Sequence, residues 1–386
     1  MTARRIAFAY SFNDADWAGG RNYFASLFRS LQAISQQEVE LVLVIGRNTV
    51  TSLPDEFPFL EVHRTPLMDR RHPLWLFRQF GLRLLDTDPL LARYLRQLGI
   101  DLLSHSGYLG KRPGLKTLPW LFDFQFVHLP EHWTAAQLRW VARRYRMACE
   151  QGDGVIVSSV DARNDLKQFL PGSTVPVHVL PFVSNHAAFQ RKAEAEGLCE
   201  RYALPRNYFH LPNQFWSHKN HGVVIDALAI LRTQGVEAVV ACTGSTSDPR
   251  SPEHFQTLMG RARSLGVESS FKVLGLIPYA DTQALMAHCV AVINPSRFEG
   301  WSTTVEEAKT LHKRLLLSNI AVHKEQSPSL GQFFSPDDPE ALARLMRNCL
   351  DTDIPSASDA DIEASHRSRS EAFARTYLDI VRSTRD

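Results

Sequence analysis

Short runs of apolar residues alternate along the chain with stretches whose apolar positions recur at helical spacing. The first apolar run covers residues 5–12, a helical pattern follows over residues 23–33, and a second run covers residues 39–45. Short apolar runs between helical stretches are typical of strands buried in a parallel sheet. The N-terminal part of the chain is therefore predicted to form alternating strands and helices.

The alternation is interrupted by a polar stretch that begins at Ser184, and it resumes at Tyr208. Two alternating units joined by a linker predict an α/β chain of two doubly wound, Rossmann-like domains facing a central cleft. A long helical pattern with an apolar face ends the chain. The predicted parts are an N-terminal domain at residues 1–183, a linker at 184–204, a C-terminal domain at 205–358 and a terminal helix at 359–386.

Composition narrows the choice of function. The chain has 386 residues, 44% hydrophobic and 22% charged, which suits an ordinary globular protein of two domains. Its formal net charge of +2 gives no drive toward nucleic acid. Its five cysteines stand singly, which suggests neither a zinc site nor a disulfide framework and fits the cytoplasm. No uncharged apolar run reaches the roughly 18 residues of a membrane-spanning helix.

One loop near the middle of the second unit combines several features of a binding site. An apolar strand at residues 290–293 runs through a turn into a helix, with Glu299 in the loop and Glu307 in the first helical turn. A helix start offers free N–H groups and a dipole that favours anions, and carboxylates can hold sugar hydroxyls. The plainer alternative is a capping box between Thr303 and Glu306, with Glu307 as an ordinary first-turn acid.

Three other loops follow predicted strands. In the loop before the helix that starts near His221, Lys219 is placed to neutralise a diphosphate, although an isolated lysine is usually a solvated surface residue. Asp123, Gln125 and His128 follow an apolar run, where doubly wound sheets place ligands, although a lone histidine is more often structural. Gly19 and Gly20 join the first strand to the first helix and could equally form a plain turn.

The second unit carries a resemblance to a known family. Phe298 to Ser302, Val305 to Ala308, Leu315 to Ser318 and His323 to Gln326 resemble the donor-binding segment of family 4 glycosyltransferases, which are retaining enzymes of the GT-B fold. The resemblance is nearly continuous from about residue 205 to about residue 345 and weaker before that. It implies a donor domain in the second unit, an acceptor-side domain in the first, and a terminal helix that crosses back to the first.

The resemblance implies roles for particular residues. The donor diphosphate would lie at Lys219 and at the helix start near Thr303, with Glu307 on the ribose and Glu299 facing the sugar. Gln214 stands where family members commonly carry an arginine, and Phe126 stands where they commonly carry a histidine. The implied catalytic residues are Glu299, Lys219 and His128. The implied donor-binding residues are Gln214, His218, Lys219, Gly275, Leu276, Ile277, Glu299, Gly300, Trp301, Ser302, Thr303 and Glu307. The implied acceptor-side or phosphate-loop residues are Gly19, Gly20, Asp123 and Gln125.

The implied function is retaining transfer of a hexosyl group from a nucleotide-diphosphate sugar to a glycan or lipid-linked acceptor. The setting would be bacterial polysaccharide, O-antigen or lipopolysaccharide assembly. No cofactor or metal is expected, because the Asp-x-Asp pairs at 14 and 16, 86 and 88, and 351 and 353 follow no convincing strand. The alternatives are a catalytically silent GT-B module that binds nucleotide-sugar or glycan, and an epimerase or phosphorylase of the same fold.

Residues 69–98 mix arginines with bulky apolar residues at helical spacing. This pattern is typical of a helix that lies on a membrane surface, and it predicts peripheral contact with the inner face of the membrane. An amphipathic helix packed on the N-terminal sheet is the alternative interpretation.

Overall fold

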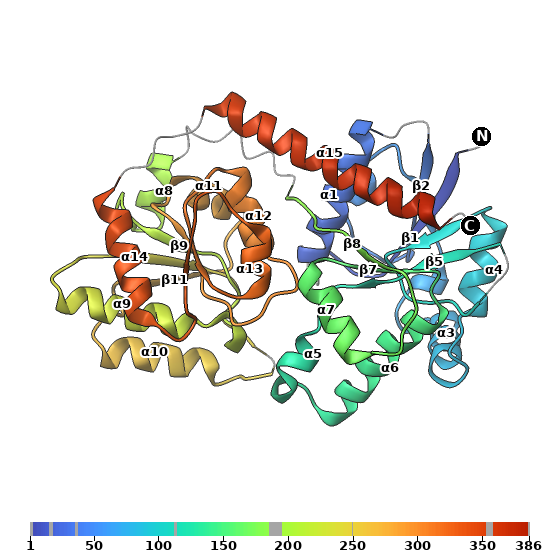
Figure 1. Cartoon of the computed structure of the whole chain (residues 1–386), viewed down its shortest axis with the longest axis horizontal. Coiled ribbons are helices and arrows are strands. Elements are labelled where there is room, and N and C mark those ends of the chain that lie inside the picture. Colours follow the sequence, from blue (N-terminus) through green and yellow to red (C-terminus); the bar gives the residue numbers. More distant parts are fainter. Residues whose placement is uncertain are drawn as a thin grey trace. The chain divides into compact units, whose positions relative to one another are not determined.

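The computed structural model describes residues 3–14, 18–34, 38–111, 114–184, 195–248, 250–352 and 358–384. The chain divides into two compact units, each of which combines parallel strands with helices (Figure 1). The first unit comprises Met1–Asn185 and Ser368–Asp386, and the second comprises His186–Arg367. The prediction of an α/β chain with two Rossmann-like domains is thereby confirmed.

Within the described residues, the first unit contains a five-stranded and a three-stranded sheet, both parallel. The larger sheet has the order β3 (Glu61–Arg64), β2 (Val39–Ile45), β1 (Arg4–Tyr10), β4 (Leu102–Ser104), β5 (Lys116–Leu118). The smaller sheet has the order β6 (Trp120–Leu121), β7 (Val155–Val157), β8 (Val177–Val179). Strand β1 is central, and its residues Ile6 to Phe8 are fully buried, which explains its continuous apolar run.

The helices of the first unit connect these strands. They are α1 (Ala18–Ile34), α2 (Leu53–Glu56), η1 (Pro66–Met68), α3 (Pro73–Leu84), α4 (Pro89–Gln97), α5 (Gln125–His128), η2 (Pro130–His132), α6 (Ala135–Gln151) and α7 (Val160–Phe169). Helix α1 begins at Ala18, so Gly19 and Gly20 lie in its first turn rather than in a loop before it. Strand β6 ends at Leu121, and α5 begins shortly after it at Gln125.

The last part of α15 (Asp359–Ser383) belongs to the first unit. The hydroxyl of Tyr377 donates to Ser104 Oγ at 2.9 Å, and the guanidinium of Arg4 donates to Thr384 Oγ1 at 2.9 Å. Phe373 joins the same buried aromatic group through its edge contact with Tyr23. The apolar positions of the terminal helix therefore complete the core of the first unit.

The second unit has a six-stranded parallel sheet among its described residues. Its order is β11 (Phe271–Gly275), β10 (Val240–Thr243), β9 (Phe209–Leu211), β12 (Val292–Asn294), β13 (Leu315–Ser318), β14 (Gly331–Phe334). Its helices are α8 (Ala195–Arg201), η5 (Ser217–Lys219), α9 (His221–Thr233), α10 (His254–Ser264), α11 (Tyr279–His288), α12 (Thr303–Thr310), α13 (Ala321–Gln326) and α14 (Pro339–Asp351). Helix α8 occupies part of the predicted linker, whose residues 185–194 lie outside the described part of the chain.

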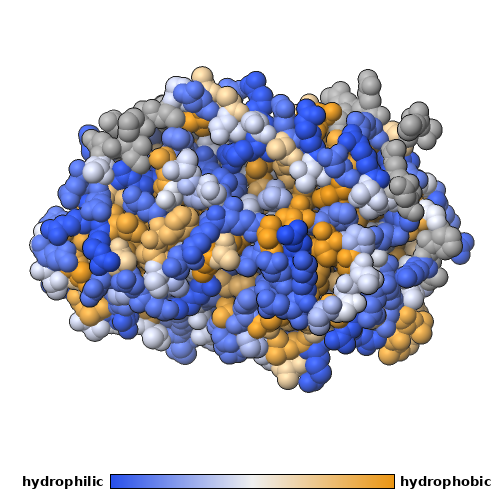
Figure 2. Space-filling view, in the orientation of Figure 1, coloured by the Kyte–Doolittle hydropathy of each residue, from blue (hydrophilic) through white to orange (hydrophobic). Residues whose placement is uncertain are grey.

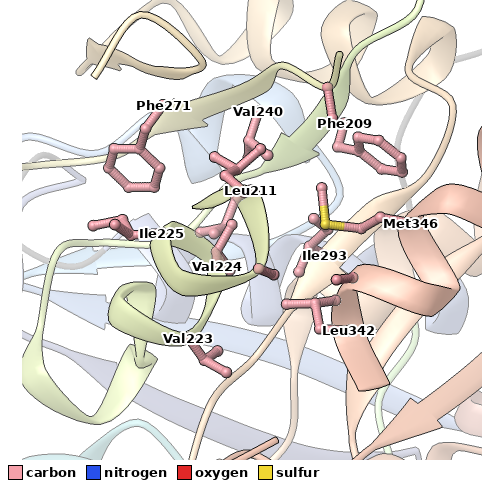
Figure 3. Packing of buried hydrophobic residues seen from close by; sticks show 14 of the residues in the cluster. Phe209, Leu211, Val223, Val224, Ile225, Val240, Phe271, Ile293, Leu342 and Met346 are labelled. Atoms are coloured by element: carbon pink, nitrogen blue, oxygen red, sulfur yellow. The ribbon is translucent and has the colours of Figure 1, made fainter. Parts of the chain in front are cut away.

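Alternating side chains of this sheet enter two core clusters, which makes the second unit a three-layer structure. Phe209, Val240 and Ile293 pack against Val224 of α9 and Met346 of α14 on one face (Figure 3). Neighbouring strand residues pack against α8, α11 and α12 on the other face. Burial on both faces holds the strands in one register, so the loops at their carboxyl ends are placed by a rigid scaffold.

Candidate functional site

The order of strands in the second unit reverses between β9 and β12. The loop after β9 continues toward β10 on one side, whereas the loop after β12 continues toward β13 on the other. In an open parallel sheet such a switch point leaves a crevice at the carboxyl ends of the strands, where ligands bind. The two loops meet there, because the Arg297 amide donates to the His218 carbonyl at 2.8 Å.

Lys219 and Glu299 come together at this switch point. Lys219 ends the short η5 helix after β9, and Glu299 lies in the loop between β12 and α12. Lys219 Nζ is 2.6 Å from Glu299 Oε1, and the two side chains are 13% and 10% exposed. At this burial the pair is largely shielded from water, so each charge depends on the other.

Glu299 is held by more than the lysine. Ser296 Oγ lies 2.6 Å from Glu299 Oε1, and the ring of His323 lies near enough to act electrostatically. Burial alone would raise the pKa of Glu299, but the charges of Lys219 and His323 and the hydrogen bonds from Lys219 and Ser296 outweigh it and lower this pKa to about 2. Glu299 is therefore a fixed anion at neutral pH.

The start of α12 differs from the predicted capping box. The N-cap residue is Ser302, whose Oγ accepts from the Val305 amide at 3.3 Å, and Thr303 is the first helical residue. Glu306 is buried, and its Oε1 accepts from Lys309 Nζ at 3.0 Å and from Gln326 Nε2 at 3.0 Å. The prediction that Thr303 caps the helix was wrong because the cap lies one residue earlier.

The capping by Ser302 leaves donors for a ligand. The amides of Thr303 and Thr304, the first two of α12, have no hydrogen-bond partner within the described ranges. The Ser302 amide donates to Gln326 Oε1 at 3.3 Å, and Asn294 Nδ2 donates to Ser302 Oγ at 2.8 Å, so the loop is fixed from two sides. A helix start with unused amides attracts a phosphate or another anion.

Glu307 lies in the second turn of α12, one turn later than the sequence suggests. It is buried, and its Oε1 accepts from the hydroxyl of Tyr279 at 2.9 Å. Tyr279 accepts in turn from Gln283 Nε2 at 2.9 Å. Tyr279 opens α11 directly after the turn that contains Gly275 and Leu276. The structure therefore joins this implied donor-binding turn to Glu307, which the resemblance places on the ribose.

The turn formed by the implied donor-binding residues Gly275, Leu276 and Ile277 is open to solvent at Leu276. Gly275 has a φ of +69° and ends β11, and its carbonyl accepts from the Gly244 amide at 2.9 Å. Leu276 is 76% exposed, and Ile277 is partly buried against the core. An exposed apolar side chain beside a fixed backbone turn could cover the face of a planar base.

Gln214 and His218 flank Lys219 in the loop after β9. Gln214 Oε1 accepts from the Ser245 amide at 2.7 Å, which engages the acceptor end of the side chain and leaves its NH2 group to donate. His218 is 4% exposed. Gln214 thus ties the loop to the end of β10 and supplies a neutral donor at the position where members of the resembled family commonly carry an arginine.

The predicted acceptor-side residues all belong to the first unit. Asp123 Oδ1 accepts from the Gln125 amide at 3.0 Å at the start of α5, and Gln125 is buried. His128 Nε2 lies 2.7 Å from Asp165 Oδ1, with the His128 side chain 43% exposed. The structure therefore supplies a carboxylate partner for His128 that the sequence did not reveal.

The pKa of His128 is expected to lie above the ordinary value of 6.5. The hydrogen bond from the ring to Asp165 raises this pKa more than partial burial lowers it. The protonated form of His128 thus stabilises the fold at low pH, and its contribution is lost as the pH rises through the raised pKa. NMR titration of the ring would measure the raised value in the wild type and a lower value in Asp165→Asn. Equal values in the two proteins would contradict this assignment.

The remaining positions considered from the sequence are the two glycines and the Asp-x-Asp pairs. Gly20 is buried and Gly19 exposed in the first turn of α1. Asp88 is bound to Arg78 and Asp86 to Arg143, whereas Asp16 and Asp353 lie outside the described residues. Within the described ranges, the structure gathers no group of three or more histidine, cysteine, aspartate or glutamate side chains that could hold a metal ion.

The second unit thus brings together Lys219 and Glu299, and it adds residues that the sequence alone did not identify. Ser296 and His323 lie near Glu299, and the hydroxyl of Tyr279 donates a hydrogen bond to Glu307. His323 belongs to a segment that resembles the family, and Ser296 belongs to the turn before Glu299. Nothing in the sequence indicates a role for Tyr279 except its place directly after a turn.

Comparison with known proteins agrees with this description. Residues 203–367 match the family described as Glycosyl transferases group 1. No curated protein shows a significant sequence match to the chain. Among solved structures, a glycosyltransferase from Rickettsia africae is 15% identical, with coverage of 100% of this chain and 99% of that one and a TM-score of 0.67.

Two further structures share the fold. The Anabaena protein HepE in complex with UDP is 16% identical, with coverage of 98% of this chain and 100% of that one and a TM-score of 0.67. Sucrose-phosphate synthase from Thermosynechococcus elongatus is 16% identical, with coverage of 98% of each chain and a TM-score of 0.70. These likenesses establish the GT-B fold for the chain. Together with the match over residues 203–367, they support a glycosyltransferase with a group 1 domain in its second unit.

Proposed function

We propose that the chain is a retaining glycosyltransferase of the family 4 type, which transfers a hexosyl group from a nucleotide-diphosphate sugar to a glycan or lipid-linked hydroxyl. The observation that carries this proposal is the Lys219–Glu299 pair, 2.6 Å apart, beside the open start of α12. A cation and unused amides suit a diphosphate, and a fixed carboxylate suits sugar hydroxyls. The HepE structures, which hold UDP or UDP-glucose, support a donor of this class.

In the proposed complex, the donor separates the two charged residues. Lys219 would turn from Glu299 to the diphosphate, which carries more negative charge than a single carboxylate. The amides of Thr303 and Thr304 would bind the same group at the helix start. Glu299, which remains ionised because its pKa is about 2, would then accept hydrogen bonds from sugar hydroxyls. The ion pair thus keeps both groups in place until the donor arrives.

The proposed reaction breaks the bond between the anomeric carbon and the phosphate oxygen and forms a bond to the acceptor oxygen on the same face. The acceptor proton passes to the departing phosphate, so a protein nucleophile is not required. Negative charge grows on the diphosphate in the transition state, where Lys219 and the α12 amides stabilise it. Glu299 would stabilise the positive charge that develops on the sugar.

The acceptor is proposed to bind the first unit. Asp123, Gln125 and His128 follow β6. A raised pKa would keep the His128 ring protonated, so that it could donate a hydrogen bond to a polar group of the acceptor. The proposed setting is assembly of a bacterial polysaccharide or lipopolysaccharide at the cytoplasmic side of the membrane. This setting rests on the resemblance to family 4 enzymes and on the singly spaced cysteines.

Ligand binding and turnover test the proposal separately. UDP, GDP, ADP and dTDP, each with and without its sugar, would be compared by thermal shift. A nucleotide at about a hundredfold excess over its Kd adds about 2.7 kcal/mol to the unfolding free energy. We expect one nucleotide to raise the melting temperature by several degrees and its sugar to be transferred with retention of configuration, as read by NMR of the product.

The outcomes distinguish the candidate functions. No shift with any nucleotide would overturn the donor site. Tight binding without transfer or donor hydrolysis would favour the catalytically silent module, and inverted configuration in the product would overturn the retaining mechanism.

A further inference from the structure

Helix α3 carries its bulky apolar side chains on the face that solvent reaches. Leu76, Phe77, Phe80 and Leu84 are 53%, 67%, 59% and 62% exposed, and Leu85 directly after the helix is 66% exposed. In the space-filling view, hydrophobic residues are gathered at the lower right, where Figure 1 places α3 (Figure 2). An apolar stripe of this kind normally faces a core, so its exposure indicates an interaction surface.

The opposite face of α3 is buried, and its orientation is set by Arg78 and Gly81. Arg78 Nε donates to Asp88 Oδ2 at 2.8 Å, with the two side chains 8% and 2% exposed, and Arg78 also donates to the Leu67 carbonyl. Gly81 lies against the turn before α4, where an added Cβ would be 2.8 Å from the Thr87 carbonyl oxygen. Rotation of the helix to hide its apolar stripe would break this buried ion pair. The outward orientation of the stripe is therefore fixed by the fold.

Arginines are numerous in the segments that adjoin the apolar stripe. Residues 69–98 contain six arginines and three aspartates, and residues 134–151 contain four arginines and one glutamate. Arg143 Nη2 lies 3.0 Å from Asp86 Oδ2, which brings α6 beside the end of α3. The exposed arginines of these two ranges are Arg70, Arg71, Arg83, Arg93, Arg96, Arg139, Arg143, Arg144 and Arg146.

Trp140 extends the apolar surface onto α6. It is 50% exposed, and Arg144 lies over its ring at 4.6 Å from the ring centre. Aromatic and aliphatic side chains with a basic border match the boundary between acyl chains and anionic headgroups. The basic border attracts an anionic partner and repels a second copy of the same surface.

We infer that this face, formed by α3 and the adjoining arginines of α6, docks the chain on an anionic phospholipid bilayer. Helix α3 lies in the plane of the interface, with Phe77 and Phe80 inserted and the arginines on the headgroups. The structure contains, in the ranges it describes, no helix that is long and apolar enough to span a membrane. The inference is independent of the proposed reaction and concerns where the chain is held.

Sedimentation of the full chain with lipid vesicles tests the inference. One set of vesicles contains phosphatidylcholine alone and the other an equal mixture of phosphatidylcholine and phosphatidylglycerol. The wild type is expected to bind the anionic vesicles at least about tenfold more tightly and to lose affinity at high salt. Phe77→Gln/Phe80→Gln is expected to lose about tenfold or more of that binding. Arg83→Gln/Arg139→Gln is expected to weaken binding to the anionic vesicles and to leave binding to the phosphatidylcholine vesicles unchanged.

A matched variant removes exposed apolar side chains elsewhere. Val50→Gln/Leu265→Gln replaces two residues that are 73% and 38% exposed, and it is expected to bind like the wild type. Melting temperatures check that each variant is folded. Absence of wild-type binding to anionic vesicles at low salt, or equal binding by Phe77→Gln/Phe80→Gln, would overturn the inference. The inference would also be overturned if the wild type formed a dimer that Phe77→Gln/Phe80→Gln dissociates, and if the wild type did not bind vesicles.

Discussion

Replacement of Lys219 by methionine is expected to lower kcat/KM for sugar transfer by about 10³, the upper range for loss of one preorganised electrostatic group. The substitution removes the cation proposed to neutralise the departing diphosphate, and the neutral Gln214 in the same loop cannot replace it. Methionine keeps the length and the apolar stem of lysine, so the loop should retain its packing. Initial rates of nucleotide release, measured with the nucleotide sugar identified by thermal shift, check this result.

Lys309→Met is the matched control. Lys309 Nζ is 3.0 Å from Glu306 Oε1, with side chains 19% and 1% exposed, so this substitution also breaks a largely buried ion pair in the second unit. Each variant should lose stability on the order of 3–5 kcal/mol, since an unpaired buried charge is left behind. Transfer by Lys309→Met, assayed well below its melting temperature, should stay near the wild-type rate. Equal losses of activity in both variants would assign Lys219 a structural role.

The fold of the second unit was predictable because its strands are buried on both faces. The apolar run from Val290 to Ile293 predicts a buried strand, and its place before a polar loop and a helix indicates the carboxyl edge of a sheet. Each of two such loops carries one candidate charged residue, Glu299 in one and Lys219 in the other. The strand order β10-β9-β12-β13 then explains why residues 80 positions apart in sequence lie in contact.

The prediction of the helix cap was wrong because several neighbouring residues can take the N-cap position. Ser302, Thr303 and Thr304 can all cap a helix, and the hydrogen bond from Asn294 to Ser302 Oγ helps to fix the cap at the first of them. Tertiary contacts of this kind leave no trace in a local pattern. The contact of Tyr279 with Glu307 likewise depends on how α11 and α12 lie side by side on the sheet.

Helix α3 shows a different limit of sequence reasoning. The spacing of Leu76, Phe77, Phe80 and Leu84 indicates that they share a face, but periodicity does not say whether that face is turned inward. The decision rests on Arg78 and its buried partner ten residues later. The packed alternative considered from the sequence is therefore wrong for these four side chains, all of which are more than half exposed.

The contribution of Glu299 to stability is expected to disappear in acid. Its folded-state pKa is about 2, below the ordinary value of 4.5, because Lys219, His323 and Ser296 together outweigh the effect of burial. A lowered pKa means that the carboxylate stabilises the fold above the unfolded-state value, and this stabilisation is lost as the pH falls toward 2. The shift corresponds to about 3 kcal/mol of unfolding free energy.

Urea unfolding of the wild type and of Glu299→Gln at a series of pH values measures this effect. At neutral pH the variant should be less stable, since glutamine leaves the charge of Lys219 unpaired, and the difference should shrink by about 3 kcal/mol as the medium becomes strongly acidic. Glu340→Gln, which changes an exposed acid at the start of α14, should differ from the wild type by a small and nearly constant amount. A difference for Glu299→Gln that is likewise independent of pH would mean that Glu299 is not held as a lysine-bound anion, and the site would then lack the fixed charge on which the proposed recognition of the sugar depends.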